Sequence, residues 1–278
     1  MQTVAIAGVG LIGGSFGLAL RAAGFTGRIL GVSSPATIRT AVGRKAIDEG
    51  ATLEEAAGCA DVILLAQPIR VILDTLGRID DLVRPGTLIT DAGSTKGCIV
   101  HRANERIRRG VFLGGHPMAG KERSGIAEAE SGLFTGRTWA LCPFDPGMLE
   151  RDPAAGFVRW IERIGARPAV LEAGEHDRLA AFTSHLPQLI STVLAETVAG
   201  RPRATELAGP ALRDLTRLAS SPYSIWRDIL STNRDAIQDA VGQFVAELQR
   251  VTTNMEGRDV ESAFDRAQAS AQILRSRE

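Results

Sequence analysis

The feature that most limits the possible fold is the glycine pattern at residues 8–13, which reads Gly-Val-Gly-Leu-Ile-Gly. The pattern follows an apolar, strand-like run at residues 3–7 and opens a helical pattern, and this context indicates a dinucleotide site. Gly8 makes the tight turn, Gly10 lets the backbone approach a pyrophosphate, and Gly13 lets helix and strand pack closely. The free N–H groups of the helix N-terminus favour that pyrophosphate. The alternative is a glycine-rich turn that binds nothing.

The second predicted strand ends in Val32-Ser33-Ser34-Pro35 and carries no acidic residue. An acid at this point would bind the ribose 2′-hydroxyl of NAD, and it would repel the 2′-phosphate of NADP. Ser33 and Ser34 can donate to either group, and Arg39 lies one turn later. We therefore expect NAD or NADP, with NADP slightly favoured. The predicted cofactor site comprises Gly8, Gly10, Leu11, Ile12, Gly13, Ser33, Ser34 and Asp91.

Residues 1–172 alternate between strand-like and helix-like segments. The run at residues 61–66 is apolar without alternation, which is typical of a parallel strand covered on both faces. Repeated βα units predict an N-terminal Rossmann-type domain with a doubly wound parallel sheet, an α/β fold. The expected strands are residues 3–7, 28–32, 61–66, 87–90, 111–113, 138–142 and 167–171.

The pattern changes at residue 173, after which strand-like runs stop. Apolar residues at helical spacing fill residues 175–199 and 241–255. Residues 173–278 are therefore predicted to form an all-helical C-terminal domain, and its long apolar stripes indicate a surface that is buried against a second subunit in a homodimer. The alternative is that the apolar stripes pack only on one another.

The overall composition excludes several classes of partner. The 278 residues have a formal net charge of zero, which argues against nucleic acid or an anionic membrane as partner. No apolar run approaches the roughly 18–20 residues of a membrane span, and the N-terminus lacks a basic signal-peptide region. Cys59, Cys98 and Cys142 have no metal-type spacing, so we expect free thiols, no metal and a cytoplasmic location.

A titratable imidazole stands between a glycine pair and a further glycine in Gly114-Gly115-His116-Pro117-Met118-Ala119-Gly120-Lys121-Glu122. Pro117 disfavours the α conformation at His116, so we expect His116 on an extended loop at a strand end. Ligands of open α/β sheets bind beyond the carboxyl ends of the strands. His116 is therefore a candidate acid–base group, and the alternative is a loop histidine that caps a carbonyl.

A second candidate segment, Asp91-Ala92-Gly93-Ser94-Thr95-Lys96, leaves another predicted strand beside the same crevice. Asp91 or Ser94 could also simply cap the next helix, and capping is compatible with catalysis. The helical domain adds Glu175-His176-Asp177 and Ser184-His185-Leu186-Pro187. We expect His176 to cap or solvate a helix start.

Together these residues resemble the prephenate/arogenate (cyclohexadienyl) dehydrogenase family of tyrosine biosynthesis. The pieces run in family order from residue 8 to about residue 230, and the histidine-proline pieces are more specific than the glycine pattern. The matching pieces are Gly8-x-Gly10-Leu11-Ile12-Gly13-Gly14-Ser15, Asp91-x-x-Ser94-x-Lys96, His116-Pro117-Met118-Ala119-Gly120-x-Glu122, Ser184-His185-Leu186-Pro187 and Thr216-Arg217 with Trp226.

The resemblance implies oxidative decarboxylation of prephenate to 4-hydroxyphenylpyruvate with NAD or NADP. It gives His116 the role of the base that accepts the substrate hydroxyl proton, and it gives Ser94 the role of orienting that contact. It implies that Arg217 binds a carboxylate of the substrate, because the planar guanidinium group can form two hydrogen bonds with a carboxylate. Trp226 either walls the substrate pocket or packs in the core, and His185 either touches substrate or fixes a helix.

One position departs from many relatives, because Gln188 stands where they carry a second histidine. This position lies toward the substrate side chain, where prephenate carries a keto group and arogenate an ammonium group. Because a neutral amide can hydrogen-bond either group, arogenate stays open as an alternative substrate. Other hydroxy-acid dehydrogenases on this plan would use a lysine of the helical domain, and residues 173–278 contain none. A non-catalytic nucleotide sensor would keep the glycines but would not need His116, Ser94 and Arg217.

Overall fold

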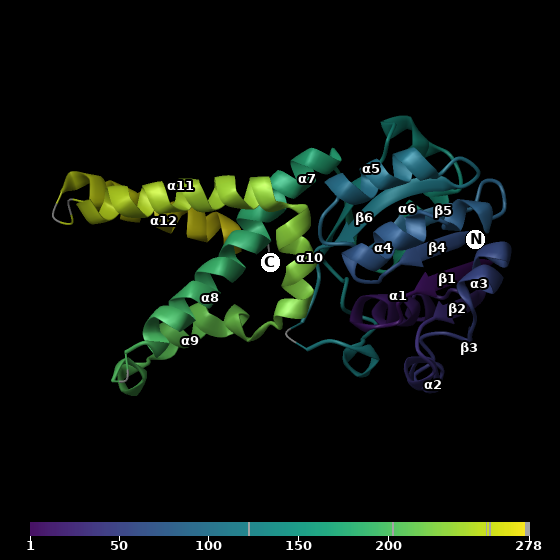
Figure 1. Cartoon of the computed structure of the whole chain (residues 1–278), viewed down its shortest axis with the longest axis horizontal. Helices are drawn as coiled ribbons and strands as arrows, with labels where there is room; N and C mark the ends of the chain where they lie inside the picture. The colour runs from purple at the N-terminus through teal and green to yellow at the C-terminus, as the bar shows by residue number, and fades with distance from the viewer. Residues whose placement is uncertain (122, 202, 254, 256, 276–278) are drawn as a thin grey trace.

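The computed structural model describes residues 1–121, 123–201, 203–253, 255 and 257–275. Figure 1 shows two parts, a sheet with helices on both faces and a set of helices that extends away from it. Glu122, which ends the His116 motif, lies outside the described residues. No described helix is long and apolar enough to cross a membrane.

The N-terminal part of the described chain is an eight-stranded sheet with the order β3-β2-β1-β4-β5-β6-β7-β8. The strands are β1 (Thr3–Ala7), β2 (Arg28–Val32), β3 (Glu49–Gly50), β4 (Val62–Leu65), β5 (Leu88–Asp91), β6 (Val111–Pro117), β7 (Thr138–Cys142) and β8 (Arg167–Val170). The Rossmann-type prediction is confirmed, with one correction. β7 pairs antiparallel with β6, whereas the other neighbours are parallel, so the sheet is mixed at one side.

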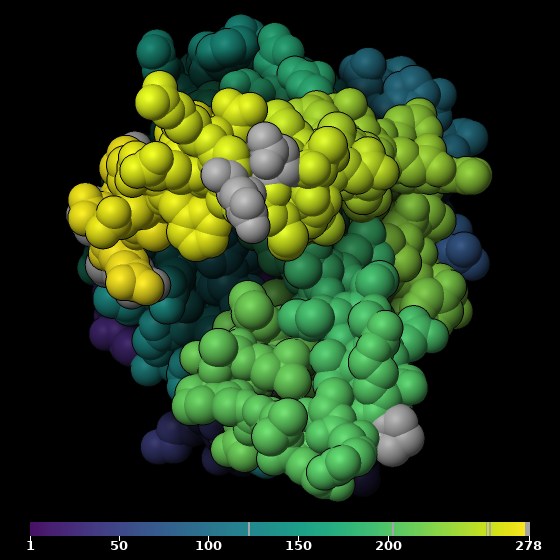
Figure 2. All heavy atoms as spheres, turned by 90° about the vertical axis from the view of Figure 1, so that its left-hand side faces the viewer, coloured from purple at the N-terminus to yellow at the C-terminus, as the bar shows by residue number. Residues whose placement is uncertain are grey.

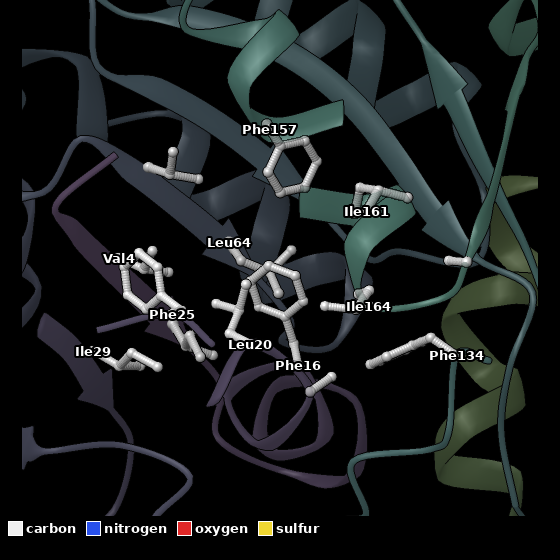
Figure 3. Close-up of a cluster of buried hydrophobic side chains, with 14 of the residues drawn as sticks. Val4, Phe16, Leu20, Phe25, Ile29, Leu64, Phe134, Phe157, Ile161 and Ile164 are labelled. Carbon is white, nitrogen blue, oxygen red and sulfur yellow. The ribbon is translucent and has the colours of Figure 1, made fainter. Parts of the chain in front are cut away.

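Helices cover both faces of this sheet. They are α1 (Leu11–Ala22), α2 (Pro35–Gly43), α3 (Leu53–Cys59), α4 (Ile69–Leu76), α5 (Gly97–Arg106) and α6 (Ala154–Arg163), with short 3-10 helices η1 (Ile79–Asp81), η2 (Ile126–Glu128) and η3 (Pro146–Glu150). On one face Phe16 of α1 packs against Phe157 of α6 in an apolar core that Figure 3 shows. On the other face α3, α4 and α5 cover Ile63 and Leu65 of β4. Burial on both faces explains why β4 is apolar throughout.

The helical part begins soon after β8. It comprises α7 (Ala173–Ala180), a π-helical turn η4 (Ala181–His185), α8 (Leu186–Ala199), η5 (Ala204–Leu207), α9 (Pro210–Thr216), η6 (Arg217–Ser220), α10 (Tyr223–Thr232), α11 (Arg234–Thr253) and α12 (Arg258–Arg275). In Figure 1, α11 and α12 form one arm, and α8 and α9 form another. A small core around Ala181, Leu186, Ile237 and Ala240 joins the bases of the two arms.

Polar and apolar contacts fix the helical part on the sheet part. Asp228 of α10 is 3% exposed and pairs with Arg70 of α4, with Oδ1 3.2 Å from the guanidinium Nε. The hydroxyls of Thr95 and Thr232 lie 2.9 Å apart. The backbone N–H groups at the start of α5 donate to Asp177 of α7. Ile229 of α10 joins the core that covers β4 and β5, so the two parts share one packed interface.

Candidate active site

The predicted dinucleotide turn has the geometry that a pyrophosphate requires. Gly8 has a φ of 94°, and a Cβ there would lie 2.4 Å from the carbonyl oxygen of Ala66, so only glycine fits the turn. A Cβ on Gly13 would lie 2.1 Å from the carbonyl oxygen of Gly8, which explains the close helix–strand packing. Gly10 is the N-cap of α1 without a side-chain hydrogen bond, and a Cβ there would meet nothing within 4 Å. Open space in front of uncapped N–H groups fits a dinucleotide phosphate.

Two adjoining cavities run along the carboxyl ends of the strands. Gly10, Ala66 and Gln67 line both of them. The larger, of about 540 Å³, is also lined by Leu11, Ile12, Ser94, Ala119, Gly120, Asp228 and Ile229. The smaller, of about 340 Å³, is lined by Gly8, Val32, Ser33 and Thr37. Five of the predicted cofactor residues therefore line one groove together with Ser94, namely Gly8, Gly10, Leu11, Ile12 and Ser33, and α10 of the helical part forms its far wall.

The two serines after β2 take different positions. Ser34 is the N-cap of α2, and its hydroxyl accepts a hydrogen bond of 3.3 Å from the backbone N–H of Thr37. Ser33 lines the smaller cavity, and its side chain is exposed there. Of the two serines, Ser33 thus lines the groove, while Ser34 shapes the helix behind it.

His116 was expected on a loop, but it lies inside strand β6 (Val111–Pro117), opposite Ala140 of β7. The strand continues through the glycines because their small size permits close packing. A Cβ on Gly115 would lie 2.6 Å from the carbonyl oxygen of Asp91 on the neighbouring strand. The glycines next to His116 therefore bring β5 and β6 together at this edge. His116 directly precedes the segment whose residues Ala119 and Gly120 line the larger cavity.

His176, which was expected to cap or solvate a helix start, is instead buried beside His116. The Nδ1 atom of His116 lies 2.9 Å from the Nε2 atom of His176. The Nδ1 atom of His176 lies 2.8 Å from Oδ1 of Asp177. His176 is 3% exposed and Asp177 is 7% exposed. The adjacent His-Asp pair at the head of the helical part was the available sequence signal, but spacing alone could not show its partner 60 residues earlier.

The N-terminus of α5 holds Asp177 in its ionised form. Burial raises the pKa of a carboxyl group, but hydrogen bonds from His176 and from the Lys96 and Gly97 backbone amides outweigh it, so the pKa of Asp177 is lowered. The two amides donate at 2.6 and 2.8 Å. Burial, with further effects of His176, Lys96 and His185, holds the pKa of His116 well below its usual value. His116 is therefore neutral at physiological pH and able to accept a proton.

Asp91 was expected to contact the cofactor, but its carboxylate is fully buried and is bonded within the chain. It forms an ion pair with Lys96, which is also fully buried. It accepts hydrogen bonds from the backbone N–H groups of Gly93 at 2.8 Å and Gly115 at 3.1 Å. Asp91 therefore joins the loop after β5 to strand β6 and supports the site from behind.

His185 and Trp226 form a packed pair between the helices. His185 is 1% exposed, and its ring lies edge-on to Trp226 with the centroids 5.9 Å apart. Its Nδ1 atom accepts a hydrogen bond of 3.2 Å from the side-chain amide of Asn233, which also donates to the backbone carbonyl of Asp177. Burial lowers the pKa of His185 to about 4, although Asp177 acts in the opposite direction. The pair thus stabilises the interface behind His176.

Gln188 and Arg217 are linked through the backbone. Gln188 is 5% exposed, and its side-chain amide donates to the carbonyl oxygen of Leu218 at 2.9 Å. The Ser191 hydroxyl accepts a hydrogen bond of 3.0 Å from the Ala219 amide. These bonds fix η6, whose first residue, Arg217, is exposed. Gln188 therefore holds the turn that carries Arg217, and neither residue lines the larger cavity around Ser94.

Ser94 lines the larger cavity near the glycine turn and is partly exposed. In the described part of the chain, no hydrogen bond joins its hydroxyl to His116. The structure thus gathers His116, His176 and Asp177 at one point, with Ser94 in the adjoining cavity. No group of three or more His, Cys, Asp or Glu side chains that could hold a metal ion occurs among the described residues.

Known family models match both the sheet part and the helical part of the chain. Residues 16–155 match the family model for the prephenate dehydrogenase nucleotide-binding domain, and residues 172–268 match the model for the prephenate dehydrogenase dimerization domain. The chain is 31% identical to prephenate dehydrogenase of Lactococcus lactis subsp. cremoris over 284 residues, covering 99% of this chain and 78% of that protein. It is 31% identical to prephenate dehydrogenase of Bacillus subtilis over 278 residues, covering 95% and 72%.

Solved structures of prephenate and arogenate dehydrogenases are similar to this structure along nearly the whole chain. Prephenate dehydrogenase from A. aeolicus, in complex with hydroxyphenyl propionate and NAD+, superimposes with a TM-score of 0.86 at 30% identity, covering 99% of this chain and 98% of that one. Arogenate dehydrogenase of Synechocystis superimposes with a TM-score of 0.83 at 27% identity, covering 98% and 99%. With matches along nearly its whole length, the chain belongs to the prephenate dehydrogenase family of NAD-dependent oxidoreductases.

Proposed function

We propose that this enzyme converts prephenate to 4-hydroxyphenylpyruvate by oxidative decarboxylation, in tyrosine biosynthesis. The observation that carries the proposal is that His116 lies on β6 directly before the segment that lines a groove able to hold a dinucleotide. Prephenate is favoured over arogenate because two curated relatives that are 31% identical over 99% and 95% of this chain are named prephenate dehydrogenases. Membership of an enzyme family also excludes a purely nucleotide-sensing role.

The groove assigns distinct tasks to the residues of the chain. Gly8, Gly10 and Gly13 bring the backbone to the pyrophosphate, and Leu11 and Ile12 line the adjoining cavity. When bound, the nicotinamide supplies the acceptor for the hydride that leaves the substrate carbinol carbon. His116 accepts the proton of the same hydroxyl, and Ser94 orients that hydroxyl from the cavity wall. Acid–base assistance of this kind contributes roughly 10²–10⁴-fold to the rate.

The substrate also carries carboxylates, which need positive partners. We assign Arg217 to one of them, because its guanidinium can form two parallel hydrogen bonds with a carboxylate. Gln188 supports this role indirectly through its bond to the carbonyl of Leu218. His185 and Trp226 support the wall behind His176 and Asp177. Arg123 adds positive charge to the rim of the larger cavity, where Lys121 is paired with Glu130.

Steady-state turnover of prephenate and of arogenate, each with NAD and with NADP, tests the proposal. We expect the highest kcat/KM with prephenate. For the cofactor, an uncharged Ser33 at the ribose end leaves NADP acceptable, and we propose a slight preference for it. A kcat/KM that is higher for arogenate would contradict the substrate assignment, and a strong preference for NAD would contradict the cofactor assignment.

Replacing Arg217 with alanine is expected to raise KM for prephenate by roughly 30-fold, since loss of a charge-assisted pair costs about 2 kcal/mol or more. Steady-state kinetics at saturating cofactor would measure this change, with little effect on kcat. Arg213→Ala, another exposed arginine one turn earlier, serves as the matched control. A loss confined to kcat would instead place Arg217 in the chemical step.

We further propose a homodimer formed through the helical part, with the domain division between residues 172 and 173. Large apolar side chains are exposed along both arms, among them Val193, Leu215, Leu248 and Phe264, each at least half exposed. Figure 2 shows the two arms with a hollow between them on this side of the molecule. So many exposed apolar side chains are typical of an interface. Sedimentation equilibrium should give about twice 29.5 kDa, and a monomer mass would contradict the proposal.

We also place the enzyme in the cytoplasm. The three cysteines are unpaired, which suits a reducing compartment. Fractionation of the host cells should recover the activity in the cytoplasmic fraction, and recovery of the activity with membranes or outside the cell would contradict this location.

A further inference from the structure

The contact between His116 and His176 crosses the boundary between the two parts of the enzyme. His116 belongs to strand β6, whereas His176 and Asp177 belong to α7, the first helix of the helical part. The three side chains form a continuous chain, with 2.9 Å from His116 Nδ1 to His176 Nε2 and 2.8 Å from His176 Nδ1 to Asp177 Oδ1. Nothing in the proton transfer to His116 itself requires the second ring, so its buried position calls for a separate role.

The direction of each hydrogen bond follows from the carboxylate. An ionised Asp177 can only accept, so the Nδ1 atom of His176 carries a proton and donates it. When the His176 ring carries this one proton, its Nε2 atom is unprotonated and can only accept. The Nδ1 atom of His116 must therefore carry the proton that closes the 2.9 Å contact. A neutral His116 with its proton on Nδ1 has an unprotonated Nε2.

We propose that His176 and Asp177 are positioning residues that hold His116 in the one neutral tautomer whose Nε2 atom can accept the substrate hydroxyl proton. The inference rests on the proposed role of His116 as proton acceptor. In the reaction the O–H bond of the substrate breaks and an N–H bond forms at Nε2. The Nδ1 proton stays on His116, and the resulting imidazolium is stabilised through His176 by the negative charge of Asp177.

The surroundings of Asp177 show that the chain is firmly anchored. Its Oδ1 and Oδ2 atoms accept the backbone N–H groups of Lys96 and Gly97 at the start of α5. The side-chain amide of Asn233 binds its backbone carbonyl at 2.8 Å. Asp177 is therefore held from both parts of the enzyme, and its carboxylate cannot turn away from His176 without losing these bonds. A histidine tautomer is set by the group that its other nitrogen meets.

The tautomer can be measured without turnover. Nitrogen-15 NMR of the full-length enzyme labelled at histidine separates protonated from unprotonated ring nitrogens, and His116→Asn assigns the His116 signals. At about pH 8, above the ordinary histidine pKa of about 6.5, the wild-type spectrum should show an unprotonated Nε2 and a protonated Nδ1 for His116. A protonated Nε2 would overturn the proposal.

A pair of substitutions at His176 tests the effect on catalysis. His176→Leu removes both hydrogen bonds and should lower kcat roughly 10–100-fold, by analogy with the loss of partners that orient metal-binding histidines. KM for prephenate should change far less. His176→Gln keeps an acceptor for His116 and a donor for Asp177, and it should retain most of kcat. His101→Leu is the matched control, because His101 is 74% exposed on α5 and should have no effect.

The outcomes separate the two proposals. If His176→Gln lost as much activity as His176→Leu, or if His176→Leu kept full kcat, the positioning role would be overturned. If His176→Leu fails to fold, the tautomer measured in the wild-type protein still decides. If prephenate is not turned over at all, the proposed function fails, while the NMR result continues to report on the His116 tautomer.

Discussion

Replacing His116 with asparagine is expected to lower kcat for prephenate by roughly 10²–10⁴-fold, because the reaction loses the group that accepts the hydroxyl proton. The cofactor groove does not depend on this side chain, so the Kd for the dinucleotide should stay unchanged. Steady-state kinetics and fluorescence titration with the cofactor would measure the two effects separately. His101→Asn, at an exposed histidine, is the control and should leave both quantities unchanged. Turnover close to that of the wild type would remove His116 from the reaction.

The pH dependence of kcat/KM gives an independent check on this residue. The acceptor must be unprotonated, and burial lowers the pKa of His116 well below its usual value. Activity should therefore be constant above neutral pH and should fall only when the pH drops below the ordinary histidine pKa of about 6.5, toward the lowered value. A fall in kcat/KM that begins at or above the ordinary histidine pKa would contradict the lowered pKa of His116.

Replacing Lys96 with methionine is expected to lower the free energy of unfolding by about 3–5 kcal/mol, because it leaves the buried charge of Asp91 without its partner. Both side chains are fully buried. Urea unfolding at fixed protein concentration would measure the change. The exposed pair Arg78–Glu54 offers a matched control, since Arg78→Met should change the free energy by about 1 kcal/mol or less.

A double variant separates the charge from the packing at this position. Asp91→Asn combined with Lys96→Met removes both charges together, so no uncompensated charge stays buried. We expect the double variant to be more stable than Lys96→Met alone. A single variant no less stable than the surface control, or a double variant less stable than the single one, would show that the ion pair is not what supports this loop.

The individual elements follow closely from local sequence patterns. The predicted strand at residues 3–7 is β1 (Thr3–Ala7), and that at residues 28–32 is β2 (Arg28–Val32). The run at residues 61–66 contains β4, whose apolar character reflects burial on both faces. The glycine turn was also predictable, because Gly8 and Gly13 meet local steric needs that no other residue satisfies.

The loop predicted around His116 shows where such patterns stop being informative. Two glycines and a proline normally favour a turn, yet β6 continues to Pro117 because β7 pairs with it antiparallel. The glycines instead permit close packing of β6 against β5, since a Cβ on Gly115 would collide with the backbone of Asp91. A contact across a sheet leaves no periodic signal in either segment, so the sequence could not distinguish a turn glycine from a packing glycine.

The sequence by itself determined the α/β alternation, the dinucleotide turn, the change to helices near residue 173 and the candidate His116, because these depend on periodicity and on short motifs. Only the tertiary structure decided which side chains meet. His176 was read as a helix-start residue and proved to be the neighbour of His116, and Asp91 was read as a cofactor contact and proved to be the buried partner of Lys96. Periodicity reports which face of an element is buried, whereas the partner on that face is set by how distant segments pack.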